Sequence, residues 1–421
     1  MHILTAQTGR HTEVLPKISG APVWLCGLQT TIFIMLACCF VGLGIFGGPS
    51  YQAAATTNIS AAAQTSATTS LEAQILTGQE LLYHGHFDDA LTVAATLKSK
   101  FPRDTRPAFL QTLIYRWLTR IEPDSAARQQ QFEQSVRATI ELAQATLKHD
   151  RGNVNAVLVL AASYGYRAEY YQFQRERWNK AYDDAVRMQE YLERAKELET
   201  SGNIDVQLGL GLYNYYAYVY RKKIGWWKFL VSLPKGDKKK GIAQITTVRE
   251  HGTHLRVEAW YFLTEIYKRD DDYGDQAIPE AKALHLAYPE QPYFHIFLAG
   301  LYHARQDWHN SLQTAQAVLK QADTSPYYSR YITAQATYLV GESSFYLGQY
   351  DDALSAFNAI ITAQPSNPPY LLPWAYLRRG TIYSLNDRKA DAVAEYQHVL
   401  KLDDTLNVHE LARGFLKNMQ K

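Results

Sequence analysis

The chain has 421 residues, of which 47% are hydrophobic and 20% are charged, a composition that excludes wholesale disorder. Its 43 Lys plus Arg nearly balance 41 Asp plus Glu, which gives a formal net charge of +2. A general nucleic-acid binder carries a strong basic excess, so we expect no nucleic-acid partner.

The first predicted element is a membrane-spanning helix at 24–46, which follows a leader at 1–23. The run holds no charged residue, and a helix of this length rises about 34 Å, close to the thickness of a bilayer core. Arg10 and Lys17 precede the run, and the next basic residue is Lys98. The positive-inside bias therefore predicts a cytoplasmic N-terminus and a periplasmic or extracytoplasmic body. A signal peptide cleaved near the alanines at 53–55 is the alternative.

The cysteines limit the chemistry of the rest of the chain. Cys26, Cys38 and Cys39 all lie in the apolar run, so the body has no disulfide framework and no cysteine nucleophile. Residues 47–70 are rich in Ala, Ser and Thr, and we predict a flexible linker there.

Residues 71–421 repeat a pattern of small and aromatic residues. Trp260, Leu263 and Tyr267 are followed by Ala277 and Pro289. Further copies share these offsets: Leu298, Tyr302 and Ser311; Gly341, Ala353, Phe357 and Pro365; Gly380, Ala392 and Tyr396; Gly78, Ala90 and Pro102. A small residue permits two helices to approach, and an aromatic ring one turn away fills the remaining gap.

This pattern resembles the tetratricopeptide-repeat (TPR) superfamily, in its exported or membrane-anchored bacterial type. The resemblance implies an all-α fold, a right-handed superhelical solenoid of about eight stacked antiparallel helix pairs. Three pairs, at 107–150, 153–199 and 203–251, are less regular. We expect a break near Pro123 with Asp124 or Ser125 as the cap, long helices at 153–199, and a terminal helix from Val408.

The resemblance also implies that the first helix of each pair lines a concave groove. Mapped onto these copies, the candidate groove residues are Tyr166, Tyr215, Tyr216, Tyr261, Glu265, Lys268, His303, Tyr338, Glu342, Phe345 and Tyr346. Tyrosine suits recognition surfaces because it offers a large contact area at a small entropy cost. Each of these rings can equally fill space between stacked helices.

An insertion at 221–240 combines basic and aromatic residues. Its candidate contact residues are Arg221, Lys222, Lys223, Trp226, Trp227, Lys228, Lys238, Lys239 and Lys240. Such a segment suits anionic lipid headgroups or an acidic glycan. The alternative is a helix extension that packs its tryptophans and leaves its lysines in water.

No motif in the chain predicts catalysis. The histidines show no metal-ligand spacing, and neither a nucleophile elbow nor a phosphate-binding glycine loop occurs. We expect no enzyme activity, no cofactor and no metal. The sequence predicts a membrane-tethered scaffold that binds a protein or peptide, with a polysaccharide-binding or export accessory protein as the alternative. A sugar site requires exposed rings in a row, whereas a protein site mixes charged and apolar positions.

Overall fold

The computed structural model describes residues 70–173, 177–198, 203–223 and 236–419. Within these ranges the fold is all-helical, with 17 α-helices and no strand. The first nine are α2 (Leu71–Tyr83), α3 (Phe87–Lys100), α4 (Thr105–Ile121), α5 (Ala126–His149), α6 (Val154–Phe173), α7 (Trp178–Leu198), α8 (Val206–Lys223), α9 (Lys238–His251) and α10 (Arg256–Arg269). The others are α11 (Ala277–Ala287), α12 (Pro292–Ala304), α13 (Trp308–Ala322), α14 (Arg330–Tyr346), α15 (Tyr350–Ala363), α16 (Leu371–Leu385), α17 (Lys389–Val399) and α18 (Val408–Met419).

The helices pack in consecutive pairs, from α2 with α3 to α16 with α17. These eight pairs match the predicted number. The terminal helix α18 begins at Val408 as predicted and packs on α16 and α17. The long helices predicted for 153–199 are confirmed, since α6 has 20 residues and α7 has 21.

Local sequence sets where the helices begin. The predicted break in the second pair is confirmed: α4 ends at Ile121, and the Ser125 hydroxyl accepts from the Arg128 backbone N–H at the start of α5. Ser70 and Ser329 cap α2 and α14 in the same way. Each cap satisfies a backbone donor that the first helical turn leaves without an intrahelical partner.

The small residues of the repeat pattern lie at points of close helix approach. A Cβ atom on Gly341 would lie 2.7 Å from the Phe357 ring, and one on Gly380 would lie 2.9 Å from the Tyr396 ring. Both rings are fully buried. The predicted pairing of a small residue with an aromatic one is therefore confirmed at these two positions.

The first half of the stack closes on itself, unlike a simple solenoid, in which each repeat contacts only its neighbours. We call α2 to α12 the closed turn. Tyr83 donates to Glu258 across 175 residues, and the Gln291 side chain donates to the backbone carbonyl of Leu82 across 209. The Ser329 hydroxyl likewise donates to the Ile121 carbonyl. The repeat pattern predicts none of these contacts, because it describes neighbouring pairs only.

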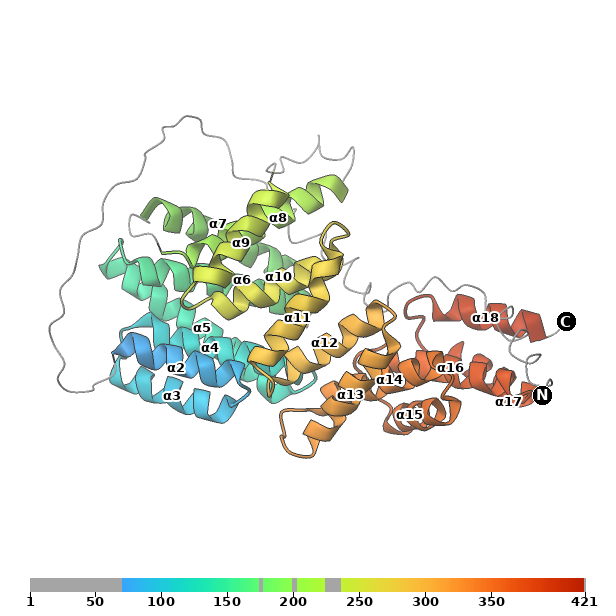
Figure 1. The fold of residues 1–421 in the computed structure, drawn as a ribbon. Helices are drawn as coiled ribbons and strands as arrows, with labels where there is room; N and C mark the ends of the chain where they lie inside the picture. Colours follow the sequence, from blue (N-terminus) through green and yellow to red (C-terminus); the bar gives the residue numbers. More distant parts are fainter. Residues whose placement is uncertain (1–69, 174–176, 199–202, 224–235, 420–421) are drawn as a thin grey trace, which may run out of the picture.

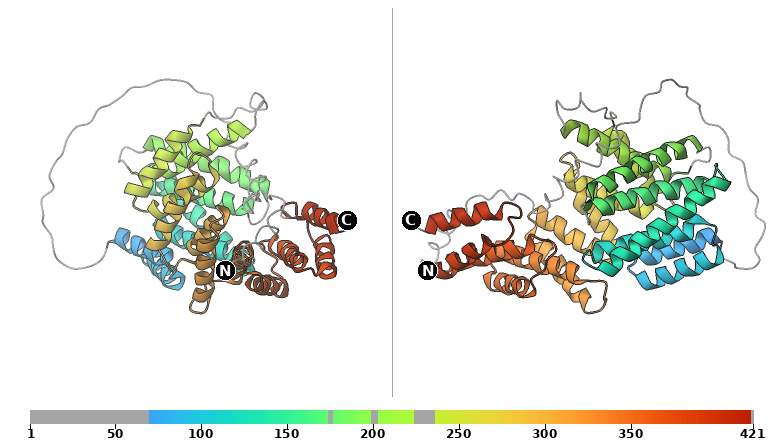
Figure 2. Two further views of the ribbon diagram at one scale, coloured as in Figure 1. Left: turned by 45° about the vertical axis from the view of Figure 1, so that its right-hand side comes forward. Right: turned by 180° about the vertical axis from the view of Figure 1, so that it is seen from behind.

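The last helices form an arm with a core of its own. Figures 1 and 2 show α14 to α18 extending away from the lobe formed by α2 to α11. The buried core of the arm runs from Tyr338 to Ala412, and a second core cluster begins at Leu82 in α2 and reaches Leu339 in α14. The two parts meet at α12 to α14, and Asn367 of the arm also donates to Asp124 after α4.

No helix in the described ranges is both long enough and apolar enough to span a bilayer. The predicted leader, membrane helix and nearly all of the predicted linker fall at 1–69, outside the described residues.

Candidate functional site

A cavity of about 630 Å³ lies inside the closed turn. It is lined mainly by first helices of pairs, namely α4, α6, α8 and α10, and also by residues of α7, with single residues from α12 and α14. One side presents charged and tyrosine side chains, and the other presents apolar side chains of α6, α7 and α8. Its size and mixed lining are typical of ligand sites, which are mostly apolar with a few convergent polar groups.

Glu258 of α10 joins four helices. Its side chain is fully buried and accepts from Arg116 Nη1 at 2.8 Å, Trp117 Nε1 at 2.8 Å, Tyr83 Oη at 3.1 Å and Tyr166 Oη at 3.4 Å. A buried carboxylate is tolerated only with such partners. Because α2, α4 and α6 supply the donors and α10 supplies the acceptor, this cluster closes the turn.

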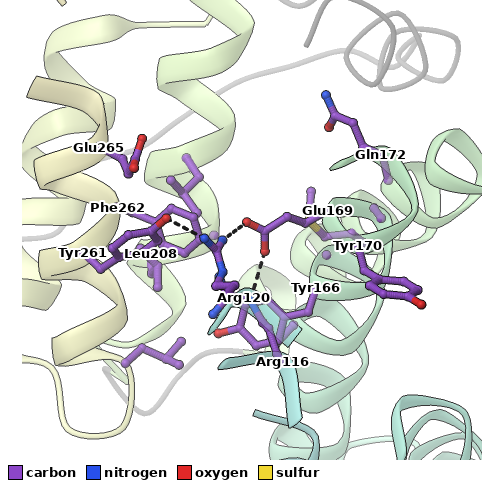
Figure 3. Close-up of a pocket in the computed structure, with 18 of the residues that line it drawn as sticks. Arg116, Arg120, Tyr166, Glu169, Tyr170, Gln172, Leu208, Tyr261, Phe262 and Glu265 are labelled. Carbon is purple, nitrogen blue, oxygen red and sulfur yellow. Dashed lines mark hydrogen bonds and ion pairs between the residues drawn. The ribbon is translucent and has the colours of Figure 1, made fainter. Parts of the chain in front are cut away.

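Two arginines of α4 converge on Glu169 of α6, as Figure 3 shows. Arg116 Nε lies 3.0 Å from Glu169 Oε2, and Arg120 Nη2 donates to Oε1 of the same carboxylate. Arg120 also donates to the Tyr261 hydroxyl at 2.7 Å. Burial alone would raise the pKa of Glu169, but the charges of Arg116 and Arg120 outweigh it and hold that pKa below its ordinary value.

A second charged group on α10 borders the cavity. Glu265 lines it and accepts from Arg269 at 2.8 Å and from Lys268 at 3.5 Å. Burial opposes ionisation of Glu265, yet the two cations hold its pKa below the ordinary value. Burial lowers the pKa of Lys268, and the charge of Glu265 only partly offsets this.

The structure divides the predicted groove residues between two places. Those that line the cavity are Tyr166, Tyr216, Tyr261 and Glu265. Tyr215 and Lys268 lie beside it: Tyr215 is buried and donates to Asp270 at 3.1 Å, and Lys268 lies against Glu265. The rings of Tyr166 and Tyr261 are only 7% and 3% exposed, so they fill space between helices more than they face the cavity.

The remaining predicted groove residues lie in the arm or at its junction with the closed turn. His303 of α12 and Tyr338, Glu342, Phe345 and Tyr346 of α14 gather around Arg378 of α16. Arg378 donates to Glu342 at 2.5 and 3.0 Å and to the Tyr346 hydroxyl at 2.9 Å. Burial opposes the charge of Glu342, but Arg378 and His303 lower its pKa to about 2. Tyr346 is 38% exposed and stacks on Trp308 with a centroid distance of 4.2 Å.

Most of the predicted basic insertion lies outside the described residues, including Trp226, Trp227 and Lys228. Lys222 and Lys223 end α8, and their side chains are also outside the description. Arg221 is half-buried on α8, whereas Lys239 and Lys240 are exposed in the first turn of α9.

Lys238 of this insertion is engaged within the fold. Its ammonium lies 2.6 Å from Asp270 Oδ1 and 2.5 Å from Asp272 Oδ2, so it neutralises two carboxylates of the turn after α10. Across the described ranges, no group of three or more His, Cys, Asp or Glu side chains is arranged to hold a metal ion.

Sequence reasoning missed the charged residues that organise both clusters. Arg116, Arg120, Glu169, Glu258 and Arg378 were not among the candidates. The available signal was the spacing of Arg116 and Arg120, one helical turn apart in the mostly apolar second half of α4. Long-range partners such as Glu258 carry no such local signal.

Comparisons with known proteins found similar chains among solved structures only. No protein-family model and no curated protein matches the sequence. A human IFIT1 dimer with m7Gppp-AAAA is similar in structure, with a TM-score of 0.43, 10% identity, and coverage of 84% of this chain and 82% of that chain.

Two other solved structures are similar at lower scores. The TPR domain of P58(IPK) has a TM-score of 0.23 and 14% identity, covering 83% of this chain and 99% of that one. Yeast Tom70 has a TM-score of 0.21 and 11% identity, covering 83% and 95%. The function of this chain therefore has to be argued from its own residues.

Proposed function

We propose that this chain is a non-catalytic repeat scaffold that binds a protein or peptide segment in the cavity of the closed turn. The observation that carries the proposal is the lining of the cavity, which mixes ion-paired side chains with an apolar surface. Such mixed lining is what a protein segment requires, because it presents both amide groups and apolar side chains.

The ionisable groups of the cavity support binding over chemistry. Glu169 is tied to Arg116 and Arg120, and Glu265 is tied to Lys268 and Arg269. A general base needs a pKa near the working pH, whereas these ion pairs hold the pKa of both carboxylates below the ordinary value.

The membrane part of the proposal rests on the uncharged run at 24–46. We propose that it tethers the helical body to the outer side of a bacterial inner membrane, as a single-pass protein with a cytoplasmic N-terminus. Headgroup or glycan contact by 221–240 would add to this tether.

A double variant tests the membrane helix. Leu36→Arg with Val41→Arg should release the chain from carbonate-washed membranes, because each charge raises the free energy of membrane insertion by about 3 kcal/mol. Retention of the double variant in the membrane pellet would count against the tether.

A polysaccharide-binding or export accessory role remains the second candidate. It is favoured by one feature, the exposed stack of Tyr346 on Trp308. The rings of Tyr166, Tyr215, Tyr261 and Tyr338 are each less than 9% exposed, so they do not present a row of faces to a sugar chain.

Photo-crosslinking on one helix tests the scaffold. p-Benzoylphenylalanine is placed in the full-length chain at Tyr216, which lines the cavity, or at Tyr218, which is 39% exposed on α8 and does not line it. We expect the Tyr216 position to yield a discrete protein adduct in cells and the Tyr218 position to yield none. Identical adduct patterns from the two positions, or none from Tyr216, would argue against a partner in the cavity.

A further inference from the structure

The apolar lining of the cavity includes residues of three helices. α7 contributes Met188 and Leu192, α6 contributes Leu158 and Ala162, and α8 contributes Leu212. We call these five residues the apolar slot. It lies between two neighbouring first helices, where the second helix α7 reaches the cavity.

Small residues of α6 and α8 lie against α7 beside the slot. A Cβ atom on Gly165 would lie 2.8 Å from Met188 Sδ, and one on Gly209 would lie 2.4 Å from Leu192. The two glycines therefore let α6 and α8 rest on α7. Ala162 presents only a methyl group to the slot.

The slot keeps apolar surface in contact with the cavity. Leu158, Met188 and Leu212 are each only half-buried, although they lie inside the closed turn. Removing such surface from water is favourable by about 25 cal/mol per Å², so an apolar group that enters the slot gains affinity.

The charged groups around the cavity have partners within the chain. The pairs of Glu169 and Glu265 leave neither carboxylate without a cation. Asp205 accepts backbone N–H groups at the start of α10, and Asp124 accepts from Asn367.

An anionic occupant would have to disrupt these pairs, and a cationic occupant would compete with the donors that Asp205 and Asp124 already have. A neutral amide can use the remaining donors and acceptors of the same side chains without breaking a pair. The occupant therefore combines an uncharged polar backbone with an apolar group.

We propose that the slot takes one large aliphatic or aromatic side chain of an extended, locally uncharged peptide segment. This inference rests on the proposed scaffold function and names the class of segment that the cavity accepts. The cavity volume of about 630 Å³ exceeds a single side chain, so the flanking backbone also lies within it, beside Arg120 and Glu265.

Peptide selection on the full-length protein in lipid nanodiscs tests the inference. Random dodecapeptides displayed on phage are selected on the parent, on Ala162→Trp, which fills the slot, and on Ala145→Trp as a matched control. Ala145 is exposed on α5 and does not line the cavity. We expect the parent and the control to enrich peptides with one large apolar residue between uncharged ones. Synthetic copies of these peptides should bind Ala162→Trp at least about ten-fold more weakly, the effect of losing one buried side chain.

A second variant keeps the test valid if Ala162→Trp does not fold. Met188→Ala deepens the slot, so among the synthetic peptides it should shift the preference from Leu toward Trp at the anchor position. A purely structural role for Met188 would weaken all peptides equally. Enrichment of charged peptides, no enrichment, or binding unaffected by either variant would overturn the inference.

The scaffold and the slot can fail separately. A cellular adduct at Tyr216 that persists in Ala162→Trp and Met188→Ala would leave the scaffold intact and refute the slot. Slot-dependent peptide binding without a cellular adduct would support the slot and refute a resident partner. Recovery of an acyl-chain lipid in place of peptide, by native mass spectrometry of the purified protein, would also refute the peptide assignment.

Discussion

At the scale of single residues, buried charges decide how the closed turn is held together. Glu258 and Arg116 are fully or almost fully buried, and neither belongs to the repeat pattern. Trp260, two residues after Glu258, does belong to it and donates to Glu280 within its own pair. The repeat residues therefore build each pair, and the charged residues between them join distant pairs.

Glu258 gives the first prediction. In Glu258→Ala, Arg116 loses one carboxylate and Trp117 and Tyr83 lose their acceptor, so the free energy of unfolding should fall by about 3–5 kcal/mol. Glu258→Gln keeps an acceptor of similar shape and should lose less. Denaturant unfolding followed by circular dichroism of the helices measures both.

Glu197→Ala is the matched control, because Glu197 is exposed on α7. Its effect should stay within about 0.5 kcal/mol. Equal losses for Glu258→Ala and Glu197→Ala would show that the buried cluster does not hold the turn closed.

A buried histidine pair gives the second prediction. The rings of His285 and His295 stack at 4.4 Å, and His295 is bonded to the Tyr328 hydroxyl at 3.1 Å. Burial, with a smaller effect of His285, lowers the pKa of His295 from 6.5 to about 3. As the pH falls below 6.5, His295 becomes protonated in the unfolded chain but stays neutral in the folded chain. The free energy of unfolding therefore falls as the pH drops below 6.5.

Between pH 6.5 and pH 5 this proton accounts for about 2 kcal/mol. His295→Gln should therefore show a smaller loss of unfolding free energy over that interval than the parent. His309→Gln, at an exposed position of α13, should follow the parent. If the unfolding free energies of His295→Gln and the parent fell equally between pH 6.5 and pH 5, His295 would not be the source of the loss.

At the scale of the helix, several boundaries follow from local chemistry. The break at Pro123 and a cap at Asp124 or Ser125 were predictable from sequence, because a cap or a proline acts on adjacent backbone groups. The start of α10 is different. Thr253, His254 and Leu255, which precede α10, donate backbone N–H groups to Asp205, which precedes α8.

Asp205 gives the third prediction. Asp205→Ala removes the acceptor of three backbone N–H groups, so the unfolding free energy should fall by about 1–2 kcal/mol. Asp205→Asn retains one acceptor oxygen and should lie between the parent and Asp205→Ala. The hydrogen-exchange rate of the amides at 253–257 should rise from the parent to Asp205→Asn and again to Asp205→Ala. Unchanged exchange there in Asp205→Ala would show that the cap acts elsewhere.

At the scale of the whole molecule, closure distinguishes the two parts of the chain. The closed turn has contacts between segments more than 140 residues apart, whereas the core of the arm is built from residues 338–412 alone. Ends of a repeat stack are normally the least protected regions. Here α2 is joined to α10 and to the segment before α12, so one apparent end is held in the interior.

Deletion of terminal elements gives the fourth prediction. Removing α2 and α3 should expose the face of α4 and α10 that carries Trp117 and Glu258, and should raise hydrogen exchange throughout α10 and α12. Removing α18 should leave exchange in α10 and α12 unchanged. Equal protection of α10 in both deletions would mean that the turn stays closed without its first pair.

The sequence by itself determined the helical class, the eight pairs, the small and aromatic packing positions and the terminal helix. These depend on residues within about one repeat of each other, where periodicity and capping act. It also placed Tyr166, Tyr216, Tyr261 and Glu265 among the groove candidates, and these four line the cavity.

Only the tertiary structure decided that the turn closes, that Arg116 and Arg120 meet Glu169, and that His303 and Tyr346 belong to a separate cluster around Arg378. Such contacts depend on the small rotation between successive pairs, summed over five pairs. No local sequence pattern specifies the accumulated rotation. A buried carboxylate such as Glu258 is stable only when that rotation has brought its hydrogen-bond donors next to it.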